Sequence, residues 1–288
     1  MDTILTELGE GPYWDTETAQ VIWVDLLAGN VNFLDPDTGV CEVRSVDEPV
    51  GAIVRAGRNW LLTVETGFQL RGPEWDLLWS KEIFAKPTPV RMNDAACDPR
   101  GRLFAGSLSC HDEPGQGCLF RLDPDGSCRV VVEGLGISNG IAWSPDQRTF
   151  YHVDSLARTV YARPYTVETG DVGPATVFYR HEADQALPDG IAVDVAGGMW
   201  IALWDGARVI RVDRDGAITD VVTLPALRVT SVAFGGPDLR TLFATSARVG
   251  LDDATLQQYP GSGQLHTFTT PISGLPVFGG PTTAGDLR

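Results

Sequence analysis

Four short segments of this chain carry oxygen-bearing side chains that could bind a metal ion. They read LGEGP around Glu10, RMND with Asn93, ISNGI with Asn139 and LPDGI with Asp189. Carboxylate and amide oxygens are the ligands that Ca²⁺, Mg²⁺ and Mn²⁺ prefer, and Zn²⁺ and Fe²⁺ also accept them. If the fold brings the four segments together, their composition predicts a site for one divalent metal ion, with Ca²⁺ as the first choice.

The spacing of these residues favours a shared site. Each precedes a turn aspartate by five to seven residues, in the pairs Glu10 and Asp15, Asn93 and Asp98, Asn139 and Asp146, and Asp189 and Asp194. Taken singly, Asn-Gly and Asp-Gly are ordinary hairpin-turn signals. The repeated placement nevertheless favours equivalent positions in a repeating fold.

Short apolar runs recur along the chain and predict strands. They are VIWVD at 21–25, LFAGS at 103–107, TFYHV at 149–153, MWIAL at 199–203 and TLFAT at 241–245. The turn aspartates Asp98, Asp146, Asp194 and Asp238 lie 48, 48 and 44 residues apart, a period typical of propeller blades. We therefore predict an all-β, six-bladed β-propeller that forms one domain over residues 1–288; the alternative is a β-sandwich or another all-β repeat.

Charge and cysteine usage limit the classes of partner. The formal net charge of −16 argues against binding to nucleic acid and to an anionic membrane surface. The five cysteines form no C-x-x-C pair, and the N-terminal residues lack the pattern of a signal peptide. We expect a cytoplasmic protein with reduced thiols, and either a monomer or a small homo-oligomer.

Six motifs give this chain a family resemblance. In order from about residue 5 to residue 250 they are LGEGP, RMNDAACDPRGRLFAGS, ISNGIAWSPD, LPDGIAVD, MWIALWDGARVIRVDRDG and TSVAFGGPDLRTLFATSAR. Together they resemble the gluconolactonase/regucalcin family, also called the SMP-30 family. The resemblance implies a six-bladed propeller that hydrolyses a small sugar-acid lactone with the help of one divalent metal ion.

The resemblance also implies roles for individual residues. Glu10, Asn139 and Asp189 would hold the metal, and Asp189 would in addition act as the base. Arg91 and Asn93 would contact the substrate. The sugar stays open among glucono-, xylono-, arabinono- and galactonolactone.

One departure from the family pattern concerns the substrate. Some members carry a substrate-contacting acid after the strand that reads FAGS here. In this chain the stretch contains Cys110, His111, Asp112 and Glu113, and we expect His111 to occupy that position. A histidine there would change the hydrogen bonds to sugar hydroxyls.

Two other functions fit the same features. One is a calcium-binding or regulatory propeller without catalysis, and the other is a phosphotriesterase-like hydrolase. The pair Arg91 and Asn93 suits hydroxylated substrates and favours the lactonase.

Three further patterns receive structural interpretations. The sequence GISNG around Ser138 matches a nucleophile elbow, but that motif needs a following helix, and a strand pattern follows here. His152 and Asp154 lie two apart in a strand and share a face, which predicts a structural hydrogen bond. The Gly-, Pro- and Thr-rich residues 276–288 predict a loose tail.

Overall fold

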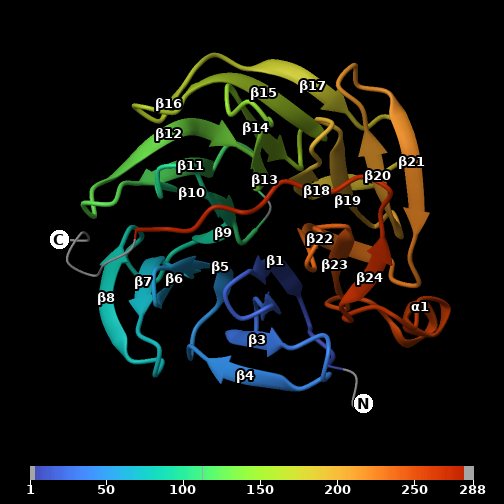
Figure 1. Cartoon of the computed structure of the whole chain (residues 1–288), viewed down its shortest axis with the longest axis horizontal. Coiled ribbons are helices and arrows are strands. Elements are labelled where there is room, and N and C mark those ends of the chain that lie inside the picture. The colour runs from blue at the N-terminus through green and yellow to red at the C-terminus, as the bar shows by residue number, and fades with distance from the viewer. Residues whose placement is uncertain (1–3, 112, 282–288) are drawn as a thin grey trace.

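Six small antiparallel sheets surround a central channel in the computed structural model, which describes residues 4–111 and 113–281. Figure 1 shows the sheets as blades around the ring. The predicted all-β class and the six-bladed propeller are confirmed. Within the described residues no helix is long and apolar enough to cross a membrane, and all five cysteines are free.

Each blade begins at the channel and ends at the rim. The innermost strands are β1 (Gly9–Asp15), β5 (Val50–Ala56), β9 (Val90–Cys97), β13 (Ser138–Trp143), β18 (Leu187–Val193) and β22 (Arg228–Gly235). The second strands are β2 (Gln20–Asp25), β6 (Asn59–Val64), β10 (Leu103–Ser109), β14 (Thr149–Asp154), β19 (Met199–Trp204) and β23 (Thr241–Ala247). Successive innermost strands contact one another, and β22 contacts β1 to close the ring.

The outer strands complete the blades. The third strands are β3 (Asn30–Leu34), β7 (Gly67–Arg71), β11 (Gly117–Leu122), β15 (Thr159–Thr166), β20 (Arg208–Val212) and β24 (His266–Thr269). The rim strands are β4 (Cys41–Ser45), β8 (Leu77–Glu82), β12 (Cys128–Leu135), β17 (Thr176–Arg180) and β21 (Ile218–Thr223). A short strand β16 (Asp171–Val172) pairs with β15, and the helix α1 (Asp253–Gln258) lies between β23 and β24.

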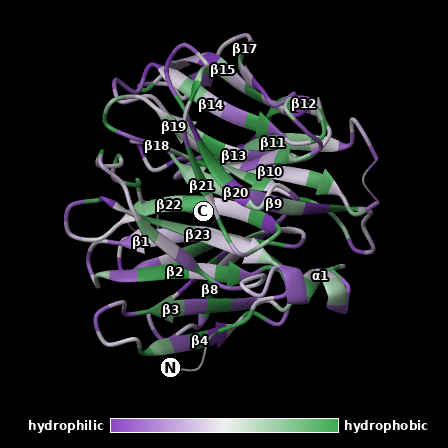
Figure 2. Cartoon of the chain, turned by 90° about the vertical axis from the view of Figure 1, so that its right-hand side faces the viewer, coloured by the Kyte–Doolittle hydropathy of each residue, from purple (hydrophilic) through white to green (hydrophobic). Residues whose placement is uncertain are grey.

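The second strands form the packed interior of the ring. The strands β6 and β10 are buried along their whole length, whereas β4, β8 and β21 are largely exposed. In Figure 2 hydrophobic residues run along the inner strands, and hydrophilic residues are frequent in the connecting loops. The apolar runs that predicted strands coincide with these second strands, because a strand covered on both faces reads as a continuous apolar run.

A β-bulge interrupts every innermost strand near its start. In each case one extra residue of the innermost strand faces the second strand, so the register shifts by one. The shifts fall after Glu10, Val50, Met92, Asn139, Pro188 and Val229. A bulge bends the strand and redirects the side chains beside it, so the six bulges mark one level of the channel.

The C-terminal segment crosses the opposite end of the channel. In Figure 1 it is the red ribbon that runs across several blades, and its residues 274–281 are called the strap below. Leu275 N donates to Val193 O over 3.0 Å, Phe278 forms a β-bridge with Cys97, and Gly280 N donates to Arg55 O over 2.7 Å. The prediction of a loose tail is therefore wrong for residues 276–281, since apolar contacts and backbone hydrogen bonds hold them; residues 282–288 lie outside the described part.

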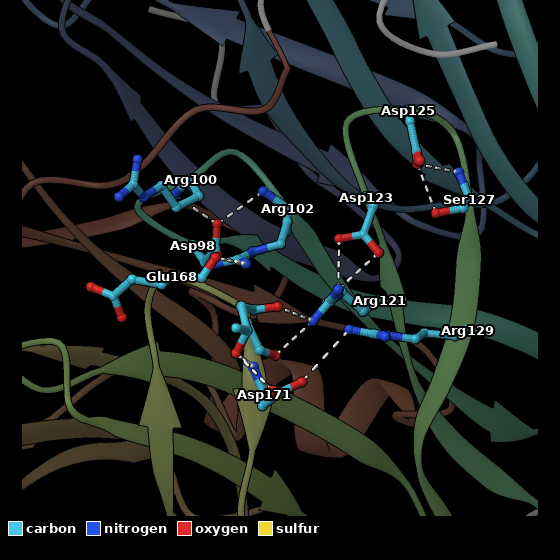
Figure 3. A network of polar contacts seen from close by, with 12 residues as sticks. Asp98, Arg100, Arg102, Arg121, Asp123, Asp125, Ser127, Arg129, Glu168 and Asp171 are labelled. Atoms are coloured by element: carbon cyan, nitrogen blue, oxygen red, sulfur yellow. Dashed lines mark hydrogen bonds and ion pairs between the residues drawn. The ribbon is translucent and has the colours of Figure 1, made fainter.

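Buried aspartates follow the innermost strands at this strap-covered end. Asp98 accepts a hydrogen bond from Arg102 Nε over 2.5 Å and another from the Tyr165 hydroxyl. Arg102 also donates to the carbonyls of Val167 and Glu168 in the next blade. Figure 3 shows Asp98 beside Arg102, with Glu168 close by. Asp194 accepts from Arg211 Nε over 2.8 Å in the same manner.

Candidate active site at the channel mouth

The structure brings the four oxygen-bearing residues to one level of the channel. Glu10, Asn93, Asn139 and Asp189 lie in β1, β9, β13 and β18, each at or directly beside a bulge. All four are buried, with between 4 and 7% of the residue exposed. Although the segments are far apart in sequence, their equivalent places in the blades put them at the same mouth.

The Asn-Gly and Asp-Gly pairs are not hairpin turns in this structure. Both pairs lie inside innermost strands, where the chain continues along the channel. A Cβ added to Gly140 would lie 2.5 Å from Asp189 O, and one added to Gly190 would lie 2.0 Å from the Ser231 hydroxyl oxygen. Glycine is required there because neighbouring innermost strands approach closely at the bulges.

A continuous chain of hydrogen bonds links three blades through this site. Arg91 Nη1 donates to Asn93 Oδ1 over 2.9 Å, and Asn93 Nδ2 donates to Asn139 Oδ1 over 2.5 Å. Asn139 Nδ2 then donates to Ser155 Oγ over 2.9 Å, and the Ser155 hydroxyl donates to Pro188 O over 2.7 Å. This series of hydrogen bonds ends at Pro188, one residue before Asp189.

Burial raises the pKa values of the acids of the site. Burial, and then the nearby Asp94 carboxylate, raises the pKa of Glu10 to about 8. Burial raises the pKa of Asp189 well above its usual range, and Glu10 and Asp94 add to this. Arg91 acts in the opposite direction on both acids but does not compensate.

These properties fit a divalent cation. Asp189 Oδ1 is buried and has no hydrogen-bond partner among the described residues. Burying unpaired carboxylates is costly unless a cation neutralises them. The described residues hold no group of three or more His, Cys, Asp or Glu side chains placed to bind a metal. The oxygen donors that the sequence predicted at this level are the carboxylates of Glu10 and Asp189 and the amide oxygen of Asn139.

Asp94 is a member of the acid cluster that sequence reasoning missed. It follows Asn93 directly, and the two residues together face Gly106 across the bulge. Burial raises the pKa of Asp94 to about 6. It also lines a pocket of about 220 Å³ on the side of the strap residue Phe278, and Glu10, Asn139 and Asp189 do not line this pocket. The sequence signal for Asp94 is its place in the RMND motif, directly after Asn93.

His111 lies at the rim of the mouth. It follows the end of β10, its side chain is exposed, and its backbone N–H donates to Ser109 Oγ over 3.2 Å. Arg91 pairs with Leu108 in the adjoining part of the same hairpin. The neighbouring residue 112 lies outside the described residues. A contact between His111 and substrate therefore stays a prediction.

The predicted hydrogen bond between His152 and Asp154 does not form in β14, the second strand of the fourth blade. His152 Nε2 lies 2.7 Å from Ser138 Oγ, while Asp154 accepts from the backbone N–H groups of Gly136 and Ile137. The expected pairing of His152 with Asp154 is therefore wrong, because each side chain finds a nearer partner. Ser138 and His152 are fully buried. Ser138 lies in the strand β13, and the strand β14 rather than a helix follows it, so the GISNG sequence is not a nucleophile elbow.

Comparison with known proteins agrees with this architecture. The family model described as SMP-30/Gluconolactonase/LRE-like region matches residues 8–248. Regucalcin of Gallus gallus is 34% identical over 286 residues, which cover 94% of each chain. The pentonolactonase XacC of Haloferax volcanii is 38% identical over 242 residues, which cover 83% of this chain and 81% of the relative.

A solved structure extends the similarity to three dimensions. The crystal structure of regucalcin from Agrobacterium tumefaciens, described as a calcium-binding protein, superposes with a TM-score of 0.89. It is 27% identical, and the match covers 97% of this chain and 95% of that one. The chain belongs to the SMP-30/gluconolactonase/LRE-like family.

Proposed function

We propose that this protein is a metal-dependent lactonase that hydrolyses sugar-acid lactones to the free acids. The observation that carries the proposal is the pair of buried acids, Glu10 and Asp189, which share one channel mouth and whose pKa values are both raised. The Haloferax relative, named a pentonolactonase, supports a lactone as substrate. Buried acids with perturbed pKa values are typical of catalytic centres.

The residues that would hold the metal are Glu10, Asn139 and Asp189. Their hard oxygen donors favour Ca²⁺, with Mn²⁺, Mg²⁺, Zn²⁺ and Fe²⁺ as other candidates. The description of the Agrobacterium relative as calcium-binding supports the same choice. When bound, such an ion supplies a Lewis acid that polarises the lactone carbonyl.

Asp189 would act as the base. Its Oδ1 accepts no hydrogen bond from the described residues and is therefore available for a water molecule. Beside a cation the carboxyl group ionises, because an opposite charge favours the carboxylate. Asp189 then takes a proton as the water oxygen bonds to the carbonyl carbon, and the proton passes to the ring oxygen when the ester C–O bond breaks. A positioned base of this kind contributes about 10²–10⁴-fold.

Arg91 and Asn93 would orient the sugar. The guanidinium group of Arg91 is half-buried beside the metal residues and offers N–H donors to hydroxyl groups. Asn93 occupies the same bulge as Asp94 and lies between Arg91 and the metal residues. At the rim, His111 would replace an acidic contact and change which sugar hydroxyls are bound.

Acid release at constant pH tests the proposal. Metal-stripped protein is supplied with single divalent ions and with glucono-, xylono-, arabinono- or galactonolactone, and the spontaneous opening rate is subtracted. We expect metal-dependent acceleration that Asp189→Ala removes and that Asp215→Ala, which alters an exposed turn acid, leaves unchanged. Background rates with every lactone and every ion would contradict the lactonase.

Calcium binding without catalysis is the second candidate. The Agrobacterium relative, which is described only as a calcium-binding protein, favours it. Under this alternative the protein would bind Ca²⁺ through the same three residues but would accelerate no lactone. Parallel measurements of Ca²⁺ affinity and of acid release separate the two functions.

A further inference from the structure

The hydrogen-bond chain through the site has a fixed direction. It begins at the Arg91 guanidinium, which can only donate, and it ends at the Pro188 carbonyl, which can only accept. Between these ends lie two carboxamides and one hydroxyl, each of which can both donate and accept. The ends therefore decide the orientation of every group between them.

The orientation can be derived from each end. Because Arg91 donates, the oxygen of Asn93 must face it, and its NH₂ group then faces Asn139. Because Pro188 accepts, the hydroxyl hydrogen of Ser155 is used there, and the Ser155 oxygen must accept from Asn139 Nδ2. Both derivations place the Asn139 oxygen towards the site and its NH₂ group towards Ser155.

We propose that Ser155 is a positioning residue that holds the Asn139 carboxamide with its oxygen towards the metal. This inference rests on the metal site of the proposed function. A flipped carboxamide would present two N–H groups to a cation and would lose its bond to Ser155. Ser155 is only 3% exposed, so bulk water cannot readily substitute for its hydroxyl.

Two other hydroxyl groups show what is particular to Ser155. Thr63 Oγ1 donates to Asn93 O over 3.1 Å, and Thr230 Oγ1 donates to Gly9 O over 2.5 Å. All three hydroxyl groups thus support the backbone of an innermost strand. Ser155 alone among these three also contacts a side chain proposed to bind the metal. It joins Asn139 to the backbone directly ahead of Asp189, and so couples two metal residues.

Calorimetric titration of the metal-stripped full chain with Ca²⁺ tests this role. We expect Ser155→Ala to weaken Ca²⁺ binding by about 10–100-fold, the usual cost of losing a group that orients a metal ligand. Ser246→Ala is the matched control, since Ser246 is a fully buried serine in the sixth blade with backbone partners. The control should bind Ca²⁺ as the unaltered protein does. Ser155→Thr, which keeps the hydroxyl, should restore most of the affinity.

A double-mutant cycle separates orientation from general structural support. In the Asn139→Asp background both side-chain oxygens are equivalent, so no flip can present N–H groups to the ion. Ser155→Ala should therefore lower Ca²⁺ affinity much less in that background. Equal losses of Ca²⁺ affinity in both backgrounds, or no loss in either, would overturn the role proposed for Ser155 and leave the proposed metal site standing. Absence of Ca²⁺ binding by the unaltered protein would overturn the metal site and this inference together.

Discussion

Buried acids at the two ends of the channel are surrounded by different groups. At the strap-covered end, Asp98 and Asp194 are fully buried, and each is held by an arginine. At the mouth, Glu10 and Asp189 are almost as deeply buried, and burial and neighbouring carboxylates raise their pKa values. Buried acids at the two ends of the channel thus have different partners: arginines at one end and other carboxylates at the other.

The difference separates structural acids from functional ones. A paired buried acid contributes to the fold, because removing one partner leaves the other charge buried alone. A buried acid whose pKa is raised by neighbouring carboxylates weakens the metal-free fold and is retained where a ligand supplies positive charge. The following predictions test this distinction, beginning with the largest expected effect.

Asp189→Asn should abolish function while sparing the fold. Burial and neighbouring carboxylates raise the pKa of Asp189 and disfavour its charged form in the metal-free protein, so a neutral amide of the same shape replaces it at little cost. We expect kcat/KM to fall by at least about 10²–10⁴-fold. The free energy of unfolding without metal should be unchanged or higher, as urea denaturation would measure. A strongly destabilised variant would contradict the distinction.

Asp98→Asn should give the reverse result. The substitution leaves Arg102 buried without its carboxylate partner, which typically costs about 3–5 kcal/mol. The folded fraction should keep its kcat/KM, because the site lies at the other end of the channel. Asp125→Asn, which changes an exposed acid in the same blade, serves as control in urea denaturation. If Asp98→Asn lowered kcat/KM while the protein was fully folded, the distinction between structural and functional acids would be contradicted.

Metal binding should release protons. At pH 7 the free protein holds a proton on Glu10, whose pKa is about 8, and the raised pKa of Asp189 acts in the same direction. A metal ion binds only the carboxylate forms, so we expect roughly one or more protons released per ion and weaker binding as the pH falls. Calorimetry in two buffers of different ionisation enthalpy measures the number. No release at pH 7 would mean that the acids are already ionised in the free protein.

Phe278→Ala should have the smallest effect. Phe278 packs against the Trp143 ring at 6.4 Å between ring centroids and belongs to the strap. Removing a partly buried ring should cost about 1–3 kcal/mol in the free energy of unfolding. Ca²⁺ affinity and kcat/KM should not change. A loss of affinity would show that the strap-covered end influences the mouth.

The sequence predicted the fold because buried strands appear in it as runs of apolar residues. The second strands, such as β10 and β19, are covered on both faces and read as apolar runs at a regular period. The repeat also predicted which residues occupy equivalent places, and the structure brings Asn93 and Asn139 into direct contact.

Other features left no such pattern. The bulges have no common composition, since the extra residue is a glycine in β13 but a threonine in β22. Ser155 reads as a turn residue after a strand, and its role follows only from two hydrogen bonds to distant segments. The strap was mistaken for a loose tail because its contacts are backbone hydrogen bonds to other blades.

The most direct test of the account is a crystal grown with Mn²⁺ and measured for anomalous scattering. The account predicts one strong peak at the mouth, bonded to oxygens of Glu10, Asn139 and Asp189, with the Asn139 amide nitrogen directed at Ser155. A fully occupied ion elsewhere in the channel, or no ion at these three residues, would contradict it.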